Sequence, residues 1–244
     1  MIRFILAAIF VFLFLLFSYI LFFIEWIIGK FNKEKKDYSC LRIVQWAFRV
    51  VLWFAGTKIT VIGEENIPEE AALYIGNHRS FFDIVILYSR CKRLTSFIAK
   101  DGIKKVPSLR VWMRHLYCLF LNRKDPREGM KVILQAIEHI KNGISVYVFP
   151  EGTRNKGEEL SLLPFKEGTF KIALKTGCPV IPISLNNTAE IFENHLPKFR
   201  KTHVIVEYGK PIDPKLLDKD EQKHLGAKCQ EIIQETIQKN AALL

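Results

Sequence analysis

The sequence predicts an α/β protein, with a mostly parallel β-sheet flanked by helices and preceded by an N-terminal two-helix membrane element. Residues 4–24 contain no charged side chain and are almost wholly apolar. Beyond residue 57, short apolar runs typical of strands alternate with helical stretches, which is the order expected of a parallel sheet covered by helices. We therefore expect two parts: a membrane-associated helical pair over residues 1–56 and an α/β domain over residues 57–244.

The first apolar segment, residues 4–24, is long enough to cross a bilayer. A helix of about 21 residues extends about 30 Å, which is the thickness of the hydrocarbon core. The run is too long for the core of a signal peptide. Four lysines follow it, at Lys30, Lys33, Lys35 and Lys36. By the positive-inside rule, a spanning helix places the rest of the chain on the cytoplasmic face of the cell membrane.

The second segment, residues 41–54, is predicted to be an amphipathic helix. Arg42, Gln45 and Arg49 recur at steps of three and four residues, which collects them on one helical face. Such a helix lies along a membrane interface or packs back on the first helix. An ordinary helix of the α/β domain is the alternative. The pair could also dip into one leaflet, and the sequence does not separate spanning from dipping.

In the α/β domain, apolar runs and capping signals predict the individual elements. We expect strands at residues 58–62, 72–75, 95–99, 117–121, 144–149, 180–185 and 203–208, and helices at 80–87, 108–115, 165–175 and 220–239. A further helix starts at Pro126, with Asp125 as its N-cap and Glu128 closing a capping box, and ends at Gly143. Ligands of such sheets bind beyond the carboxyl ends of the strands.

Charge and cysteine content limit the classes of partner. The formal net charge of the 244 residues is +11, which suggests a lipid surface, a phosphorylated substrate or an acidic protein. Nucleic acid is not expected, because the aromatic residues lie in apolar runs rather than among the basic ones. The five cysteines are scattered and form no Cys-x-x-Cys pair. We therefore expect neither a disulfide framework nor a metal site.

The first polar motif, Asn-His-Arg-Ser-Phe-Phe-Asp at residues 77–83, follows a predicted strand. With His78 in the loop and a helix starting near Ser80, Asp83 can reach back from the first turn. A carboxylate that holds one imidazole nitrogen leaves the other free to accept a proton, and such general-base catalysis contributes roughly 10²–10⁴-fold. Alternatively, Ser80 and Asp83 form a capping box, so that Asp83 only caps the helix.

The second motif, Phe-Pro-Glu-Gly-Thr-Arg at residues 149–154, also follows a predicted strand. Gly152 permits a sharp turn, Thr153 offers a hydroxyl and an N–H, and Arg154 offers a fork suited to phosphate. Glu151 is expected to hold Arg154 or a neighbouring guanidinium. A polar surface turn is the alternative. Further cations could join this phosphate site, namely Arg123, Lys100 and Lys105.

Together, a base and a phosphate site predict a phosphorylated alcohol as acceptor, and the membrane element predicts that it is a lipid. No Gly-x-Ser-x-Gly elbow, P-loop, Gly-x-Gly-x-x-Gly or His-Glu-x-x-His is present. Without an obvious protein nucleophile, His78 is expected to activate a substrate hydroxyl for direct transfer. The rivals are a membrane-bound lipid hydrolase or phosphodiesterase that uses the same His–Asp pair on water, and a basic module that binds anionic lipid without turnover.

Four blocks in order resemble the 1-acylglycerol-3-phosphate (lysophosphatidic acid) acyltransferases of the glycerophospholipid acyltransferase family. Residues 77–83 and 149–154 match the first and third blocks, Phe120-Leu121-Asn122-Arg123 resembles the second, and Val180-Ile181-Pro182-Ile183 matches the fourth. The family often has Gly where this chain has Tyr117, and Asp where it has Asn122.

The resemblance implies a role for each matching residue. His78 is the general base that Asp83 orients, and the acceptor-phosphate site includes Arg123, Glu151, Gly152 and Arg154, while the fourth block shapes the site near the acyl chain. The reaction moves an acyl group from an acyl carrier protein or coenzyme A thioester to the free sn-2 hydroxyl of 1-acylglycerol-3-phosphate. The product is phosphatidate, an intermediate of phospholipid biosynthesis, and the chemistry needs no metal or cofactor.

Overall fold

A computed structural model describes residues 1–122 and 125–244, and it confirms the predicted fold class. Within this part of the chain, seven strands form one sheet in the order β1-β7-β6-β2-β5-β3-β4, and only the β6–β7 pair is antiparallel. The strands are β1 (Lys58–Ile62), β2 (Leu73–Gly76), β3 (Thr95–Lys100), β4 (Leu119–Leu121), β5 (Ser145–Val148), β6 (Val180–Asn186) and β7 (His203–Tyr208).

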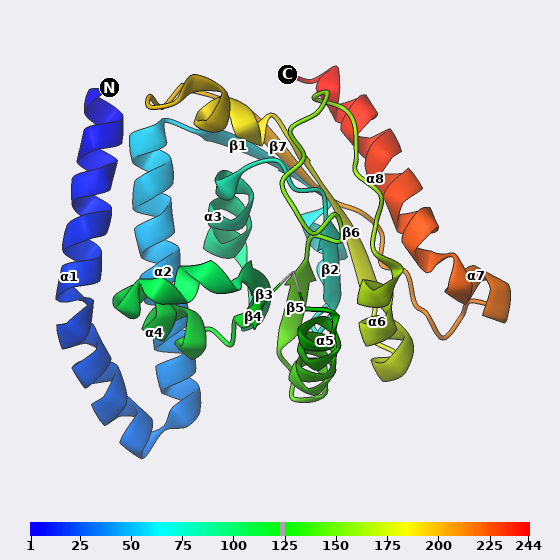
Figure 1. Ribbon diagram of the computed structural model, residues 1–244, viewed down its shortest axis with the longest axis horizontal. Helices are drawn as coiled ribbons and strands as arrows, with labels where there is room; N and C mark the ends of the chain where they lie inside the picture. The colour runs from blue at the N-terminus through cyan, green and yellow to red at the C-terminus, as the bar shows by residue number, and fades with distance from the viewer. Residues whose placement is uncertain (123–124) are drawn as a thin grey trace.

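Helices cover both faces of this sheet (Figure 1). They are α1 (Ile2–Phe31), α2 (Lys33–Ala55), α3 (Phe81–Arg90), α4 (Pro107–His115), α5 (Pro126–Lys141), α6 (Lys171–Thr176), α7 (Lys219–Lys223) and α8 (Leu225–Ala241). Alternate strand residues point to opposite faces. Tyr74 therefore packs in one core with α2 and α3, whereas Leu73 and Ile75 pack in a second core with α5, α6 and α8.

On the polar face of α2, Gln45 is buried against the C-terminal end of α3, whereas Arg42 and Arg49 are exposed. The side-chain amide of Gln45 donates to the carbonyl oxygens of Cys91 at 2.7 Å and Tyr88 at 3.3 Å, and Arg49 donates to that of Ser89 at 3.4 Å. These bonds satisfy carbonyl groups that a helix end leaves without intrahelical partners. The polar stripe therefore joins α2 to the domain. Helix α2 also packs back on α1, which was one of the two arrangements predicted for it.

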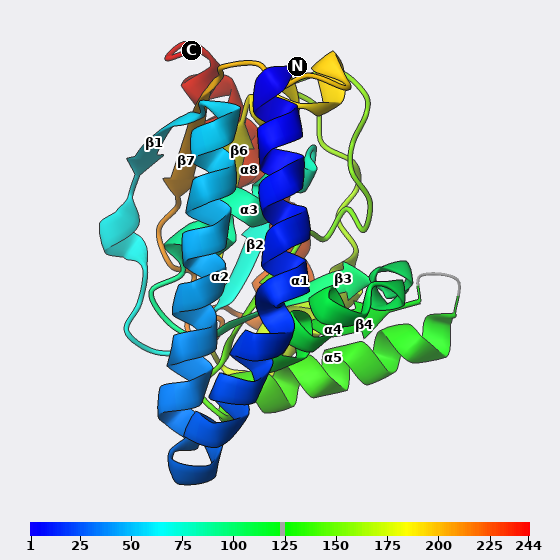
Figure 2. The same cartoon turned by 90° about the vertical axis from the view of Figure 1, so that its left-hand side faces the viewer.

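Helix α1 lies beside α2 in antiparallel orientation (Figure 2). Among the described residues it is the one helix that is long and apolar enough to cross a membrane, judged by length and composition. It also contacts the domain at its N-terminal end, where Phe4 stacks on Phe192 at a ring-centroid distance of 5.2 Å, and beyond its middle, where Phe22 packs on Trp112 at 5.0 Å. Between these contacts, the Trp112 indole donates to the Ser18 hydroxyl at 2.7 Å.

Four local predictions were wrong in detail. The helix expected at residues 165–175 is a 3-10 helix at Glu167–Phe170 followed by the short α6. Strand β4 starts two residues later than expected because Tyr117 adopts a left-handed φ of 58°, which interrupts an extended strand. The C-terminal helix is divided at His224 into α7 and α8. Helix α5 has the predicted cap, with Asp125 accepting from the Arg127 N–H at 2.9 Å, but Glu128 binds Lys131 at 2.8 Å instead of closing a capping box.

Candidate active site

The two motifs meet beyond the carboxyl ends of β2 and β5, which are neighbouring parallel strands. There, a cleft of about 700 Å³ is lined by residues of both motifs. Its polar lining includes His78, Lys100, Gly152, Thr153, Arg154 and Lys166. Its apolar lining includes Ile84, Ile98, Leu121, Met130 and Phe149. We call this space the His78 cleft.

His78 and Asp83 form the predicted pair. The Nδ1 atom of His78 lies 2.8 Å from Oδ2 of Asp83, and Asp83 is completely buried. The imidazole stacks on the ring of Phe149 at a centroid distance of 4.2 Å, which fixes its plane. Among the residues that the structure describes, none is recorded as a partner of His78 Nε2. The ring that lines the cleft therefore presents one unpaired nitrogen to it.

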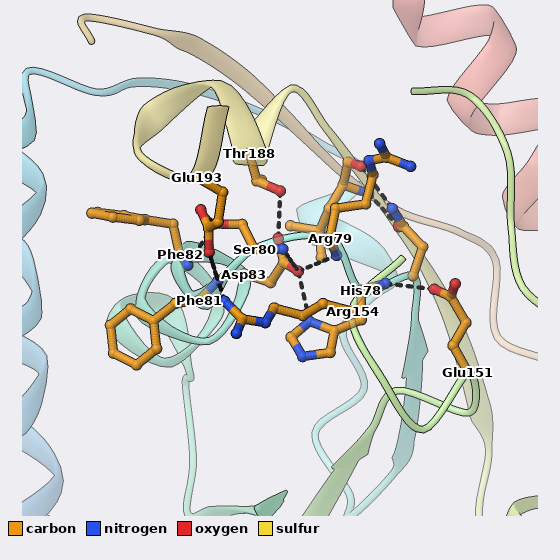
Figure 3. Close-up of polar contacts among 12 residues, drawn as sticks. His78, Arg79, Ser80, Phe81, Phe82, Asp83, Glu151, Arg154, Thr188 and Glu193 are labelled. Carbon is orange, nitrogen blue, oxygen red and sulfur yellow. Dashed lines mark hydrogen bonds and ion pairs between the residues drawn. The ribbon is translucent and has the colours of Figure 1, made fainter. Parts of the chain in front are cut away.

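Asp83 serves both of the roles that the sequence left open (Figure 3). Helix α3 starts after Ser80, whose extended backbone and side chain form a capping box with Asp83. The same oxygen that contacts His78 accepts from the Arg79 and Ser80 N–H groups at 2.7 and 2.8 Å. The other oxygen, Oδ1, accepts from the hydroxyl of Thr188. Hydrogen bonds of this kind stabilise the ionised carboxylate.

The second motif holds the main chain of His78 in place. Oε1 of Glu151 accepts from the His78 N–H at 2.7 Å, and Oε2 accepts from the Leu163 N–H at 3.0 Å. The carbonyl oxygen of His78 accepts from the Asn155 N–H at 2.7 Å. Burial raises the pKa of Glu151, and these N–H groups oppose the rise in part. Within residues 1–122 and 125–244, both carboxylate oxygens of Glu151 thus bind main-chain N–H groups, and Arg154 pairs with Glu193 instead of with the predicted Glu151.

The preceding residue, Asn77, fastens the loop to β6. Its amide nitrogen donates to the Leu185 carbonyl at 2.9 Å, and its amide oxygen accepts from the Leu185 N–H at 2.8 Å. Through these two hydrogen bonds, the Asn77 side chain pairs with the β6 main chain just beyond the last paired residue of β2. The loop that carries His78 is thus fixed to β6 on one side and to the Glu151 turn on the other.

Arg154 reaches the N-terminus of α3. Its Nη1 atom lies 3.0 Å from Oε1 of Glu193, and its side chain is 46% exposed. At the turn before it, Gly152 has a φ of 71°, and a Cβ there would lie 2.6 Å from the ammonium nitrogen of Lys166. The positive φ favours glycine at this position, and the close approach shows that the flexible end of the Lys166 side chain lies directly over the turn.

A second hollow, of about 930 Å³, reaches Arg79 and Arg154 from the side of the 187–203 segment. It is the larger of the two, but His78 does not line it. We place the reacting groups in the His78 cleft because only that space includes the unpaired imidazole nitrogen.

Comparison with known proteins gives the family. The sequence matches the family described as Acyltransferase over residues 58–186, which is more than half of the chain. The chain belongs to this acyltransferase family. It is 31% identical over 191 residues to the 1-acyl-sn-glycerol-3-phosphate acyltransferase of Saccharomyces cerevisiae, a match that covers 78% of this chain and 63% of the yeast protein. The chain thus spans less than two thirds of that relative's length.

Two further proteins show the extent of the similarity. The chain is 32% identical over 178 residues to the 1-acyl-sn-glycerol-3-phosphate acyltransferase of Borreliella burgdorferi, covering 72% of this chain and 70% of that protein. Its fold is similar to the crystal structure of the 1-acyl-sn-glycerophosphate (LPA) acyltransferase from Thermotoga maritima. The TM-score is 0.85 at 25% identity, and the match covers 99% of this chain and 95% of the other.

The structure places most of the sequence-predicted residues of the acyltransferase at one site. His78, Gly152, Thr153, Arg154 and Lys100 all line the His78 cleft, with Asp83 directly behind His78. Lys105 is exposed and does not line the cleft, so the prediction that it binds the phosphate finds no support in its position. Arg123 lies outside the described residues.

The fourth block does not line the cleft either. Val180, Ile181, Pro182 and Ile183 are buried in β6, where all four pair with β2. Their contribution to the acyltransferase site is indirect, since β6 supports Asn77 through Leu185. The expectation that this block shapes the site near the acyl chain stays a prediction, since the block does not line the His78 cleft.

Three residues of the site were missed from the sequence. Thr188 and Glu193 lie more than 100 positions from the His78 motif that they contact, and no local spacing connects them with it. The parallel pairing of β6 with β2 brings these two residues to the His78 motif. Lys166 lines the cleft. Nothing in the sequence around it distinguishes it from an ordinary surface lysine.

Proposed function

We propose that this protein transfers an acyl group from an acyl thioester to the free sn-2 hydroxyl of 1-acylglycerol-3-phosphate, giving phosphatidate in phospholipid biosynthesis. The observation that carries the proposal is the His78–Asp83 contact of 2.8 Å at the wall of a cleft that also contains Arg154. The similarity to the 1-acyl-sn-glycerol-3-phosphate acyltransferases of yeast and Borreliella burgdorferi supports the same reaction.

In the proposed mechanism, His78 acts as the general base. Its Nε2 atom accepts the proton of the acceptor hydroxyl as the oxygen attacks the thioester carbonyl carbon. Asp83 stays ionised and holds the Nδ1–H, which fixes the tautomer and stabilises the imidazolium. The tetrahedral intermediate then expels the thiolate, which takes up the proton from His78. Every proton is returned, and no metal or cofactor enters the reaction.

The acceptor phosphate is proposed to bind to cations of the same cleft. Arg154, Lys100 and Lys166 supply positive charge there, and Thr153 adds a hydroxyl. A guanidinium binds phosphate through two parallel N–H donors, which orients the lipid as well as holding it. Holding both reactants in this way can supply roughly 7–11 kcal/mol of the barrier reduction.

The lipid acceptor is proposed to reach the cleft from the membrane. Large apolar residues of α1 are exposed, among them Phe12 at 66% and Phe23 at 61%. Because Phe4 and Phe22 both pack on the domain, we infer that α1 dips into one leaflet beside the domain rather than crossing the bilayer alone. The basic turn around Lys33 would then be attracted to the anionic lipids of the cytoplasmic leaflet.

Product analysis tests the proposal against the hydrolase that uses the same pair on water. The purified protein in detergent is given a labelled acyl thioester, either coenzyme A or acyl carrier protein, with and without 1-acylglycerol-3-phosphate, and the products are identified by mass. Phosphatidate that forms only with the acceptor supports transfer. Free fatty acid at the same rate in both reactions would support the hydrolase instead.

A further inference from the structure

Glu193 lies on the segment after β6, and its carboxylate joins the two motifs (Figure 3). Its Oε2 atom accepts from the Ser80 hydroxyl at 2.7 Å. Its Oε1 atom accepts from the Phe81 N–H at 2.7 Å and from Nη1 of Arg154 at 3.0 Å. One carboxylate thus contacts the first turn of α3 on one side and the proposed phosphate-binding arginine on the other.

The α3 side of this contact is rigid. Ser80 and Phe81 belong to the turn whose N–H groups also bind Asp83, so the position of Glu193 is fixed relative to the His78–Asp83 pair. A carboxylate is favoured there because the first N–H groups of a helix and its dipole attract negative charge. The Glu193 side chain is 20% exposed, whereas that of Arg154 is 46% exposed. The better-buried carboxylate is therefore the anchor, and the arginine is the group that is anchored.

The Arg154 side of the contact leaves donors available. Glu193 engages only Nη1, and among the described residues no hydrogen bond to Nη2 or Nε of Arg154 is recorded. A guanidinium carries five N–H donors in a rigid fork. The edge that Glu193 does not occupy can therefore bind an anion in the His78 cleft, which Arg154 lines.

We propose that Glu193 is a positioning residue that orients Arg154 to bind the acceptor phosphate by holding its guanidinium at the N-terminus of α3. The proposal rests on the proposed function, in which Arg154 binds that phosphate. Glu193 does not itself line the His78 cleft. Its effect is therefore exerted through Arg154, and it is specific for the phosphorylated acceptor rather than for the acyl donor.

A double-mutant cycle tests the proposal. Acyl transfer is measured for the wild-type protein, Glu193→Ala, Arg154→Ala and the double variant, and KM is determined for 1-acylglycerol-3-phosphate and for the acyl thioester. Glu193→Ala is expected to raise the acceptor KM about 10-fold, as for loss of a hydrogen bond between charged groups. The donor KM and kcat should change less than about 3-fold, because Asp83 keeps its own hydrogen bonds. The double variant should match Arg154→Ala.

Two variants separate positioning from loss of structure. Glu193→Gln preserves the shape of the side chain and is expected to raise the acceptor KM in the same direction but less. Glu190 lies on the same segment, but its carboxylate binds His195 and Arg200 instead of the two motifs. Glu190→Ala should therefore leave the acceptor KM unchanged.

Three results would overturn the proposal. The first is independent effects of the two substitutions, so that their fold-changes multiply in the double variant. The second is a fall in the acceptor KM, which would mean that Glu193 competes with the phosphate. The third is an equal rise for Glu190→Ala. If the wild-type protein itself transfers no acyl group to 1-acylglycerol-3-phosphate, the proposed function fails along with the inference. If the wild-type protein does transfer the acyl group but the double-mutant cycle gives one of these three results, only the inference about Glu193 fails.

Discussion

The carboxylate of Glu151 accepts the main-chain N–H of His78 at 2.7 Å, across 73 positions of sequence. This bond makes the two motifs one structural unit, because the turn that carries Arg154 also fixes the backbone of the proposed base. The Asn155 N–H adds a second link, to the carbonyl oxygen of the same residue. The second motif therefore supports the His78 loop as well as contributing cations to the cleft.

Glu151→Gln should lower kcat by about 10- to 100-fold. The amide has one oxygen, so either the His78 N–H or the Leu163 N–H would face an NH₂ group and lose its acceptor, which costs roughly 1–3 kcal/mol when buried. The loss would displace His78 relative to Asp83. Steady-state kinetics with saturating substrates measure the change, and an undiminished kcat would show that His78 is held by other contacts.

The same substitution tests the raised pKa of Glu151. Since burial raises this pKa above its ordinary value of 4.5, the protonated group stabilises the fold fully below that value, and the contribution is lost as the pH rises through the raised pKa. Glutamine does not titrate. The Tm of the wild type minus that of Glu151→Gln should therefore fall as the pH rises above 4.5. A difference that grows with pH would contradict the shift.

Thr188 should matter through its hydroxyl alone. Thr188→Val removes the donor to the buried Oδ1 of Asp83 while keeping the shape, and it should lower kcat about 10-fold, because a hydrogen bond to a charged group is worth roughly 1.5–3 kcal/mol. Thr188→Ser keeps the donor and should retain most of the activity. Similar kcat values for both variants would show that the hydroxyl has no part in holding Asp83.

Arg154→Ala should raise KM for 1-acylglycerol-3-phosphate more than KM for the acyl thioester, because only the acceptor carries the phosphate that Arg154 is proposed to bind. A difference of about 10-fold between the two effects is expected for the loss of a charge-assisted pair. Lys105→Ala serves as the control, since Lys105 is exposed outside the cleft. Equal effects of Arg154→Ala on both substrates would count against the phosphate role.

The exposed aromatic residues of α1 should contribute to membrane binding. Replacing Phe12, Phe17 and Phe23 by serine removes side chains that are 66%, 56% and 61% exposed. Burying each of these rings is worth roughly 1.5–3 kcal/mol, so partitioning into vesicles should fall more than about 10-fold. Leu216→Ser changes another apolar residue, 83% exposed but distant in sequence from α1, and it should bind like the wild type. Unchanged flotation of the triple variant would argue against membrane contact along α1.

Much of the fold followed from local patterns. Helix α3 has its cap at Ser80, and the fully buried β5 follows Ile144, both close to where the sequence placed them. Where local patterns left alternatives open, tertiary contacts decided some of them. The polar face of α2 was compatible with a membrane interface or with packing on α1. The structure shows the packing on α1 and the Gln45 bonds to carbonyl groups at the end of α3, while contact of α2 with a membrane stays a prediction. The division at residue 56 stays a prediction, since α2 shares a core with the sheet.

Tyr117, where the sequence departs from the family pattern, has an unusual backbone conformation. The family often has Gly at this position, and the backbone here has a φ of 58°, which costs other residues roughly 1–2 kcal/mol. The Tyr117 hydroxyl compensates by donating to the buried carboxylate of Asp37 on α2. The sequence alone signalled the substitution but not the contact that accommodates it.

The site was predictable only where its parts are close in sequence. His78 and Asp83 are five positions apart, so their pairing could be argued from one loop and one helix turn. Thr188 and Glu193 meet the same turn from more than 100 positions away. Their contacts depend on β6 pairing with β2, and this strand order leaves no mark in either local sequence.

The most direct test of the central claim is the rate of phosphatidate formation by His78→Ala in lipid vesicles. We expect a loss of roughly 10²–10⁴-fold, with vesicle binding unchanged. His224→Ala, which removes an exposed imidazole on the far helical surface, should react like the wild type. A His78→Ala protein that forms phosphatidate at a near-wild-type rate would contradict the assignment of His78 as the base.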